Sequence, residues 1–163
     1  MSRIDGKIAL ISGAASGIGA QSARVLAAAG GVVVITDVNE AEGRQLAGEI
    51  EAAGHSACFH RLDVTREEDW DAVTARVCDD LGGLDVLVNN PGIECIENIE
   101  DLTLEQWHRI CRVNLDGVFL GTKYGIRAMT SGSTSRPRGG SIINLSSVAG
   151  IVGTPGQSAY NMT

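Results

Sequence analysis

Aromatic residues are scarce in this sequence, and it has no long apolar run. Phe, Trp and Tyr make up 4% of the 163 residues while glycine occurs 21 times, a composition that favours aliphatic strands joined by tight turns. No apolar run approaches the ~20 residues that a bilayer-spanning helix needs. The N-terminal stretch MSRIDGK lacks the apolar core of a signal peptide. We therefore expect no membrane segment and a cytoplasmic protein.

An excess of positive charge is also absent, as are groups of metal-binding residues. The formal net charge of −7 argues against nucleic acid or an anionic membrane surface as the main partner. The cysteines lie far apart without a C-x-x-C pair, and the histidines show no metal-ligand spacing, so we expect neither a disulfide framework nor a metal site. These residues are Cys58, Cys78, Cys95, Cys111, His55, His60 and His108. We expect Cys58 and Cys78 to be core thiols.

What the sequence does contain is a glycine-punctuated stretch, KIALISGAASGIG, over residues 7–19. Its apolar start predicts a strand that is buried on both faces, as in a parallel sheet. Gly13, Gly17 and Gly19 then allow a tight turn into a helix and the close approach of a bulky group. The N–H groups and the positive dipole end of that helix attract an anion, and a pyrophosphate is the anion we expect. The alternative is a tight strand-to-helix turn that binds nothing.

A second apolar run, over 31–37, predicts another buried strand that ends in Asp37. This carboxylate lies roughly 20 residues beyond the glycine turn, where an acidic side chain can bind the ribose hydroxyls of an adenine nucleotide. Positions 16, 38 and 39 hold Ser, Val and Asn, so none of the three is an arginine or a lysine. Because a carboxylate repels a 2′-phosphate, the cofactor expected is NAD rather than NADP.

The remainder of the chain alternates strand and helix patterns. We expect helices over 18–29, 39–53, 65–81, 103–129 and 157–163, the fourth with a bend near 114–117, and strands over 8–11, 31–37, 56–62, 84–89 and 141–145. The polar segment over 130–140 is expected to be a mobile surface connection. Such alternation predicts one α/β domain with a doubly wound parallel sheet and helices on both faces.

Polar residues follow the predicted strands at the point where each strand ends. They are Asp37, Asp63, Asn89, Asn90, Ser146 and Ser147. In open parallel sheets, ligands bind at the carboxyl ends of the strands, which meet along one edge of the sheet. These side chains are therefore expected to share one site.

These motifs together resemble the short-chain dehydrogenase/reductase family, in its classical group, and the resemblance covers the whole chain. SGAASGIG over 12–19 is similar to the T-G-x-x-x-G-x-G turn, with Ser12 in place of Thr. The stretch over 89–92 matches N-N-A-G with Pro91 in place of Ala, and Asp63-Val64 matches the adenine-contacting pair. Ser147 precedes Tyr160 by thirteen positions, as the serine and tyrosine of the family do, which favours Ser147 over Ser146.

The resemblance implies a Rossmann-type fold, NAD as the cofactor and a specific set of site residues. The implied catalytic residues are Asn114, Ser147 and Tyr160. The implied cofactor-binding residues are Gly13, Ser16, Gly17, Ile18, Gly19, Asp37, Asp63, Val64, Asn90, Gly92 and Tyr160.

The chemistry that the resemblance implies is hydride transfer between a secondary alcohol and a ketone. Tyr160 would move the hydroxyl proton as a general acid/base. A free phenol titrates near pH ~10, so a lysine and the cationic nicotinamide are needed to stabilise the phenolate. Ser147 would hydrogen-bond the substrate oxygen, and Asn114 would hold a water in the proton relay.

Two departures from the family pattern leave alternatives open. Pro91 lacks an N–H and biases Asn90 toward extended geometry. The family motif Y-x-x-x-K is cut after Tyr160-Asn161-Met162-Thr163, so we expect a C-terminally incomplete N-terminal part of a dehydrogenase, without its last strands. Alone, such a chain is expected to be poorly soluble or inactive, because the strand over 141–145 becomes a sheet edge. The alternative functions are a catalytically silent nucleotide- or partner-binding module and an acyl-carrier-protein reductase.

The substrate and the assembly are weakly encoded. The side chains of Ile93, Ile96, Ile151 and Val152 favour an apolar alcohol or ketone, such as a sterol or cyclic alcohol, and the alternative is that they only pack. The resemblance implies a homo-oligomer, a tetramer or dimer, with the helix over 104–129 at an interface.

Overall fold

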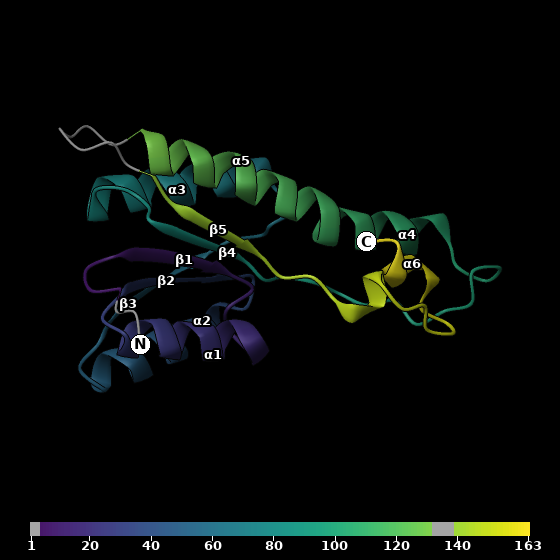
Figure 1. Ribbon diagram of the computed structural model, residues 1–163, viewed down its shortest axis with the longest axis horizontal. Helices are drawn as coiled ribbons and strands as arrows, with labels where there is room; N and C mark the ends of the chain where they lie inside the picture. The colour runs from purple at the N-terminus through teal and green to yellow at the C-terminus, as the bar shows by residue number, and fades with distance from the viewer. Residues whose placement is uncertain (1–3, 132–138) are drawn as a thin grey trace.

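The computed structural model describes residues 4–131 and 139–163, which form one parallel sheet between two sets of helices (Figure 1). The strands are β1 (Ile8–Ser12), β2 (Val32–Asp37), β3 (Ser56–Arg61), β4 (Val86–Asn89) and β5 (Ser141–Asn144). Their order is β3-β2-β1-β4-β5, and every neighbouring pair is parallel. The predicted doubly wound parallel sheet is confirmed, whereas residues 132–138 of the expected polar connection lie outside the described part of the chain.

Helices cover both faces of this sheet. They are α1 (Gly17–Ala28), α2 (Glu40–Ala52), α3 (Glu67–Leu81), α4 (Leu104–Cys111), α5 (Gly117–Thr130) and α6 (Ser158–Asn161). Helices α1 and α2 pack on one face, and α3 and α5 pack on the other. Figure 1 shows α5 running above β4 and β5, with α4 and the short α6 beyond its far end.

The three central strands, β1, β2 and β4, are apolar because both of their faces are largely buried. In β1, Leu10 belongs to the core under α3 and α5, while its neighbour Ile11 belongs to the core under α1 and α2. The same alternation places Leu87 and Val88 of β4 in the two different cores. Successive side chains of a strand point to opposite faces, so a sheet covered on both sides requires an unbroken apolar run.

The connection between β3 and α3 differs from its prediction. Helix α3 begins at Glu67, not at Thr65, because the Thr65 backbone N–H and hydroxyl both donate to the Asp63 carboxylate, at 3.0 and 2.7 Å. The backbone N–H of Arg66 donates to the Asp63 carbonyl and closes the turn. The expected acidic first turn is present, and Gly82 ends the helix in the left-handed conformation at φ 84°.

The long helix predicted after Thr103 is present in two pieces. Thr103 and Gln106 form the expected capping box at the start of α4. A π-helical segment, η1 (Arg112–Asp116), joins α4 to α5. The predicted bend near 114–117 therefore coincides with a turn that holds one residue more than an α-helical turn.

None of the helices described, over 4–131 and 139–163, is both long enough and apolar enough to cross a membrane.

Candidate functional site

The glycine turn between β1 and α1 forms the floor of a cavity of about 440 Å³ at the carboxyl ends of the strands. Gly13 adopts φ 62°, a left-handed conformation that side chains disfavour. Gly19 lies so close to the carbonyl oxygen of Gly13 and the side chain of Asn90 that a Cβ there would collide with both. A tightly folded turn of this kind exposes backbone N–H groups to a ligand.

The start of α1 is suited to an anion. The Ser16 side chain makes no capping hydrogen bond, and the first turn of the helix contains no acidic residue. Ser16, Gly17 and Ile18 all line the cavity. The unsatisfied N–H groups and the positive end of the helix dipole therefore face the space that a ligand would fill.

Asp37, at the end of β2, is held against the glycine turn. One carboxylate oxygen accepts a hydrogen bond from the backbone N–H of Ala15, and the other accepts one from Asn39, both at 3.0 Å. The residue lines the cavity. The contact across the two strand ends places a negative charge where the ribose of a nucleotide was expected.

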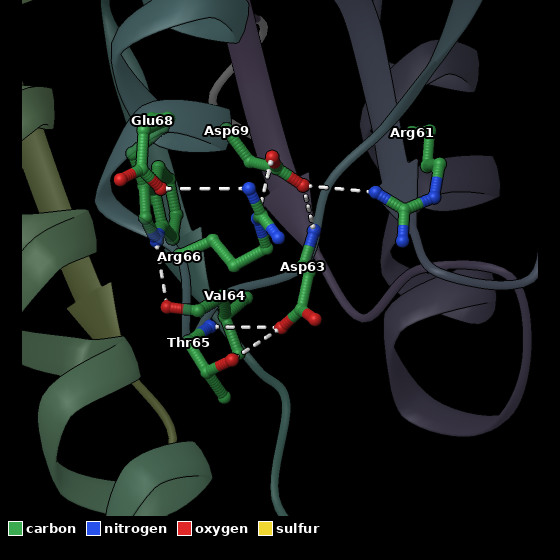
Figure 2. Close-up of polar contacts among 8 residues, drawn as sticks. Arg61, Asp63, Val64, Thr65, Arg66, Glu68 and Asp69 are labelled. Carbon is green, nitrogen blue, oxygen red and sulfur yellow. Dashed lines mark hydrogen bonds and ion pairs between the residues drawn. The ribbon is translucent and has the colours of Figure 1, made fainter.

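The opposite wall of the cavity is the segment Leu62, Asp63 and Val64 after β3. Figure 2 shows the Asp63 carboxylate bonded to Thr65 and its backbone N–H bonded to Asp69. The indole N–H of the buried Trp70 donates to the Val64 carbonyl at 3.1 Å. This segment is thus rigidly attached to the first turn of α3.

The two asparagines after β4 have different roles. The amide of Asn90 donates to the carbonyl oxygens of Ser12 and Gly13, and the residue lines the cavity. Asn89 is buried and donates instead to Asn144 of β5 and Thr122 of α5, at 2.9 and 3.4 Å. Asn90 therefore belongs to the site, while Asn89 joins the two strands and α5 beneath it.

A second cavity of about 240 Å³ adjoins the first, since Ile18, Asn90, Pro91 and Gly92 line both. Its other walls bring together Asn114, Ser147 and Tyr160, which lie far apart in the sequence. Ser146, the alternative to Ser147, also lines it. The three expected catalytic residues thus meet beside the expected cofactor residues.

The polar groups in this second cavity are partly engaged with one another and with backbone. The Asn114 amide bonds to both backbone polar groups of Ile93, at 2.9 and 3.0 Å, and donates to the Thr163 hydroxyl at 3.0 Å. The Ser147 hydroxyl oxygen accepts a hydrogen bond from the Ala149 N–H at 3.1 Å and retains its own proton for donation. Asn114 therefore orients the Ile93 loop, and Ser147 presents a donor.

Nine of the eleven expected cofactor residues line the larger cavity. Tyr160 lines the second cavity instead, and Gly19 lies behind the turn. Sequence reasoning missed three apolar lining residues, Val38, Leu62 and Val113. Val38 and Leu62 flank predicted acids and could have been inferred from that position, whereas Val113 carries no sequence signal.

The clearest pKa shifts lie away from both cavities. Hydrogen bonds from Lys123 and Tyr124 lower the pKa of the Glu67 carboxyl, and burial raises the pKa of the Tyr124 hydroxyl. Burial also lowers the pKa of His60. No group of three or more metal-ligating side chains occurs within 4–131 and 139–163.

Comparison with known proteins places this chain among dehydrogenases. The model of the short chain dehydrogenase family matches residues 7–163. The trans-4-hydroxycyclohexanecarboxylate dehydrogenase of Sinomonas cyclohexanicum is 46% identical over 97% of this chain and 61% of its own length. The 3-alpha-(or 20-beta)-hydroxysteroid dehydrogenase of Mycobacterium tuberculosis (strain ATCC 25618 / H37Rv) is 42% identical over 99% of this chain and 59% of its own length.

A solved structure agrees with these relatives. The gluconate 5-dehydrogenase of Burkholderia cenocepacia J2315, in complex with NADP and tartrate, superimposes with a TM-score of 0.88 and 35% identity, over 98% of this chain and 61% of the other. The chain therefore spans about three fifths of the length of these relatives. With a parallel sheet of the same type and a family match from residue 7 to residue 163, the chain belongs to the short-chain dehydrogenase family.

Proposed function

We propose that the protein carrying this chain is an NAD-dependent dehydrogenase that interconverts a secondary alcohol and a ketone. The observation that carries the proposal is the junction of the two cavities. One contains the glycine turn and Asp37, and the other contains the hydroxyls of Ser147 and Tyr160. A redox cofactor and an acid/base pair would thus meet at their shared wall.

The residues of the larger cavity fit a nicotinamide nucleotide. The crowding at Gly19 keeps the turn close-packed, and the start of α1 offers N–H groups to a pyrophosphate. Asp37 would accept hydrogen bonds from the ribose hydroxyls, while Asp63 and Val64 would flank the adenine ring. When bound, such a nucleotide accepts or donates the hydride, a chemistry that side chains do not supply.

The residues of the second cavity would handle the proton. In the oxidative direction, the Tyr160 oxygen takes the proton of the substrate hydroxyl, and in the reductive direction it returns that proton to the carbonyl oxygen. Ser147 donates a hydrogen bond to the same substrate oxygen and stabilises its developing charge. The Asn114 side chain is occupied by Ile93 and Thr163, so we propose that it positions the wall beside the substrate.

The preference for NAD follows from charge. No lysine or arginine is among the described residues that line the larger cavity, and Asp37 faces it with a carboxylate. A nucleotide with a free 2′-hydroxyl can donate to that carboxylate, whereas a 2′-phosphate is repelled by it.

The proposed substrate is an apolar cyclic alcohol or its ketone. Exposed apolar side chains flank lining residues of the second cavity in the sequence: Val148 follows Ser147 and is 73% exposed, and Ile151 follows Gly150 and is 87% exposed. Side chains of this kind gain by burial against an apolar substrate. The relatives named for hydroxycyclohexanecarboxylate and hydroxysteroid support the same class.

We also propose a homo-oligomer and a cytoplasmic location. Leu104, Phe119 and Ile126 of α4 and α5 are between 50% and 67% exposed, as expected for residues that a second copy covers. The four cysteines are thiols rather than disulfides, which fits a reducing compartment.

The decisive experiment compares the two tyrosines of this chain. Reduction of NAD by a panel of cyclic secondary alcohols is followed with the full-length protein and with Tyr160→Phe. We expect the variant to lose turnover by roughly 10²–10⁴-fold while it still binds NAD, because only the transferable proton is removed. Tyr124→Phe is the matched control, since Tyr124 belongs to α5 and its hydroxyl donates a hydrogen bond to Glu67 of α3, away from both cavities. Unchanged turnover in Tyr160→Phe would refute the proposed role.

A further inference from the structure

Asp69, in the first turn of α3, is the centre of a charged cluster (Figure 2). The cluster adjoins the larger cavity, because Asp69 is bonded to Asp63, which lines that cavity. One of its oxygens accepts hydrogen bonds from the Arg61 guanidinium at 2.9 Å and from the Asp63 backbone N–H at 3.0 Å. Its other oxygen pairs with the Arg66 guanidinium at 3.3 Å. The Asp69 carboxylate thus binds two arginines and the backbone of Asp63, which lines the larger cavity.

Asp69 is more buried than the two arginines that it pairs with. Its side chain is 19% exposed, whereas those of Arg61 and Arg66 are 48% and 58% exposed. The arginines are the longer and more exposed partners, and they pair with a short carboxylate that also accepts a hydrogen bond from the Asp63 backbone. Surface ion pairs are individually weak, but this one is arranged around a partly buried acceptor.

Arg61 is the cation that adjoins the ribose end of the site. It lies opposite Asp37 in the register of β2 and β3. Asp37 lines the cavity, and none of the lining residues among those described is a lysine or an arginine. The side chain nearest in register to the ribose-binding acid is therefore a guanidinium that is paired elsewhere.

We propose that Asp69 is a specificity-determining residue, which favours a nucleotide with a free 2′-hydroxyl over one with a 2′-phosphate by retaining Arg61 away from Asp37. Arginine binds phosphate through several hydrogen bonds and is charged at all working pH values. Released from Asp69, Arg61 would offset the negative charge of Asp37 and supply donors to a 2′-phosphate. This inference rests on the proposed nucleotide site. It makes Asp69, in addition to Asp37, a determinant of the preference for a nucleotide without a 2′-phosphate.

The test uses two nucleotide fragments that carry only the adenine and ribose end, adenosine 5′-monophosphate and adenosine 2′,5′-bisphosphate. Calorimetric titration gives the ratio of their affinities for the parent protein and for Asp69→Asn. Asparagine keeps an oxygen for the Asp63 N–H but loses the charge that retains the arginines. We expect the ratio to shift toward the bisphosphate by about tenfold.

A double variant tests whether Arg61 causes the shift in the affinity ratio, and a second variant serves as the control. In Asp69→Asn/Arg61→Gln the ratio should return to the parent value, because the released cation is gone. Glu68→Gln is the matched control: it removes the same charge from the same helical turn, but Glu68 is 78% exposed and its ion pair is a long one with Arg66, at 3.8 Å. Its ratio should stay within about twofold of the parent.

Each contrary result has a distinct meaning. An equal loss of affinity for both fragments in Asp69→Asn would show that Asp69 only supports the cavity wall, and the inference would fail. If Asp69→Asn does not fold, the single variant Arg61→Gln tests the proposal. A marked loss of bisphosphate affinity would mean that Arg61 already reaches the 2′-position, so that Asp69 does not keep it away. An unchanged affinity ratio would support the proposal that Asp69 keeps Arg61 away from the site. A parent protein that binds neither fragment would instead overturn the proposed nucleotide site.

Discussion

The Asn90 side chain donates a hydrogen bond of 2.8 Å to the carbonyl oxygen of Gly13, across 77 positions of sequence. The same amide nitrogen donates to the Ser12 carbonyl at 3.2 Å. Asn90 therefore fastens the end of β4 to the turn that would receive a pyrophosphate. The shape of that turn depends on this amide as well as on its glycines.

Asn90→Ala is expected to weaken both the fold and the site. The carbonyl oxygens of Ser12 and Gly13 lose a partner in a half-buried place, which should lower the free energy of unfolding by about 1–3 kcal/mol. Affinity for NAD should fall by about tenfold or more, as the turn is no longer held. Urea unfolding and calorimetric titration measure the two effects. Asn98→Ala, at an exposed loop position, is the control, and equal behaviour of both variants would contradict this role.

Asp37→Asn should change the cofactor preference. The amide oxygen can still accept the Ala15 N–H, but the charge that attracts ribose hydroxyls and repels a 2′-phosphate is lost. We expect the affinity for NAD to fall by about tenfold while that for NADP falls less or rises. Titration of both nucleotides measures this, with Asp101→Asn in an exposed turn as the control. Unchanged affinity for both nucleotides would show that Asp37 is not at the ribose.

Gly121→Ala should destabilise the contact between α5 and the sheet. A Cβ at this position would collide with the Asn89 amide oxygen and lie 2.9 Å from the Trp70 ring, and both neighbours are buried. The expected loss in the free energy of unfolding is about 1–3 kcal/mol.

Gly48→Ala is the matched control for that variant. Gly48 is an exposed residue inside α2, and a Cβ there meets nothing within 4 Å. The change should therefore stabilise the protein by about 0.5–1 kcal/mol through helix propensity. If urea unfolding gave both variants the same sign, the packing argument at Gly121 would be wrong.

Glu67→Gln should remove part of the acid sensitivity of the fold. Hydrogen bonds from Lys123 and Tyr124 lower the pKa of Glu67 below its unfolded value of 4.5, so the unfolded state binds the proton more readily. The stabilisation is therefore present above that value and is lost as the pH falls through the lower, folded pKa.

Unfolding midpoints measured from pH 7 down to pH 3 test this effect. The parent should lose more stability on acidification than Glu67→Gln does, and the variant should be the less stable of the two at neutral pH. Glu100→Gln, at an exposed turn, should retain the parent's slope. Parallel curves for Glu67→Gln and the parent would show that the contact contributes nothing to stability.

Local patterns in the sequence are sufficient to predict the sheet and most of the residues that line the larger cavity. The glycine turn is predictable because it follows a buried strand, and Asp37 because it ends one; parallel strands bring such ends to one edge of the sheet. The contact that joins them, from the Ala15 N–H to the Asp37 carboxylate, follows from β1 and β2 being neighbours.

Other parts of the site depend on packing that the sequence does not display. The three acids at the start of α3 are explained equally well by the helix dipole, so nothing in the sequence distinguishes Asp69 from Glu68. Only the placement of α3 beside the end of β3 brings Arg61 to Asp69. The start of α3 was predicted too early for a related reason, because Asp63 binds Thr65 in a local turn that competes with the helix.

In the π-helical segment between α4 and α5, the number of residues affects the orientation of the following helix more than the identity of those residues does. One added residue rotates everything beyond it by roughly 100° about the helix axis. This offset allows Asn114 to face the second cavity while Leu120 and Tyr124 face the sheet. Substitutions inside Arg112–Asp116 would leave the rotation of α5 relative to α4 unchanged. A single deletion would convert the segment to regular helix. Either Asn114 would then turn away from the second cavity, or the core residues of α5 would turn away from the sheet.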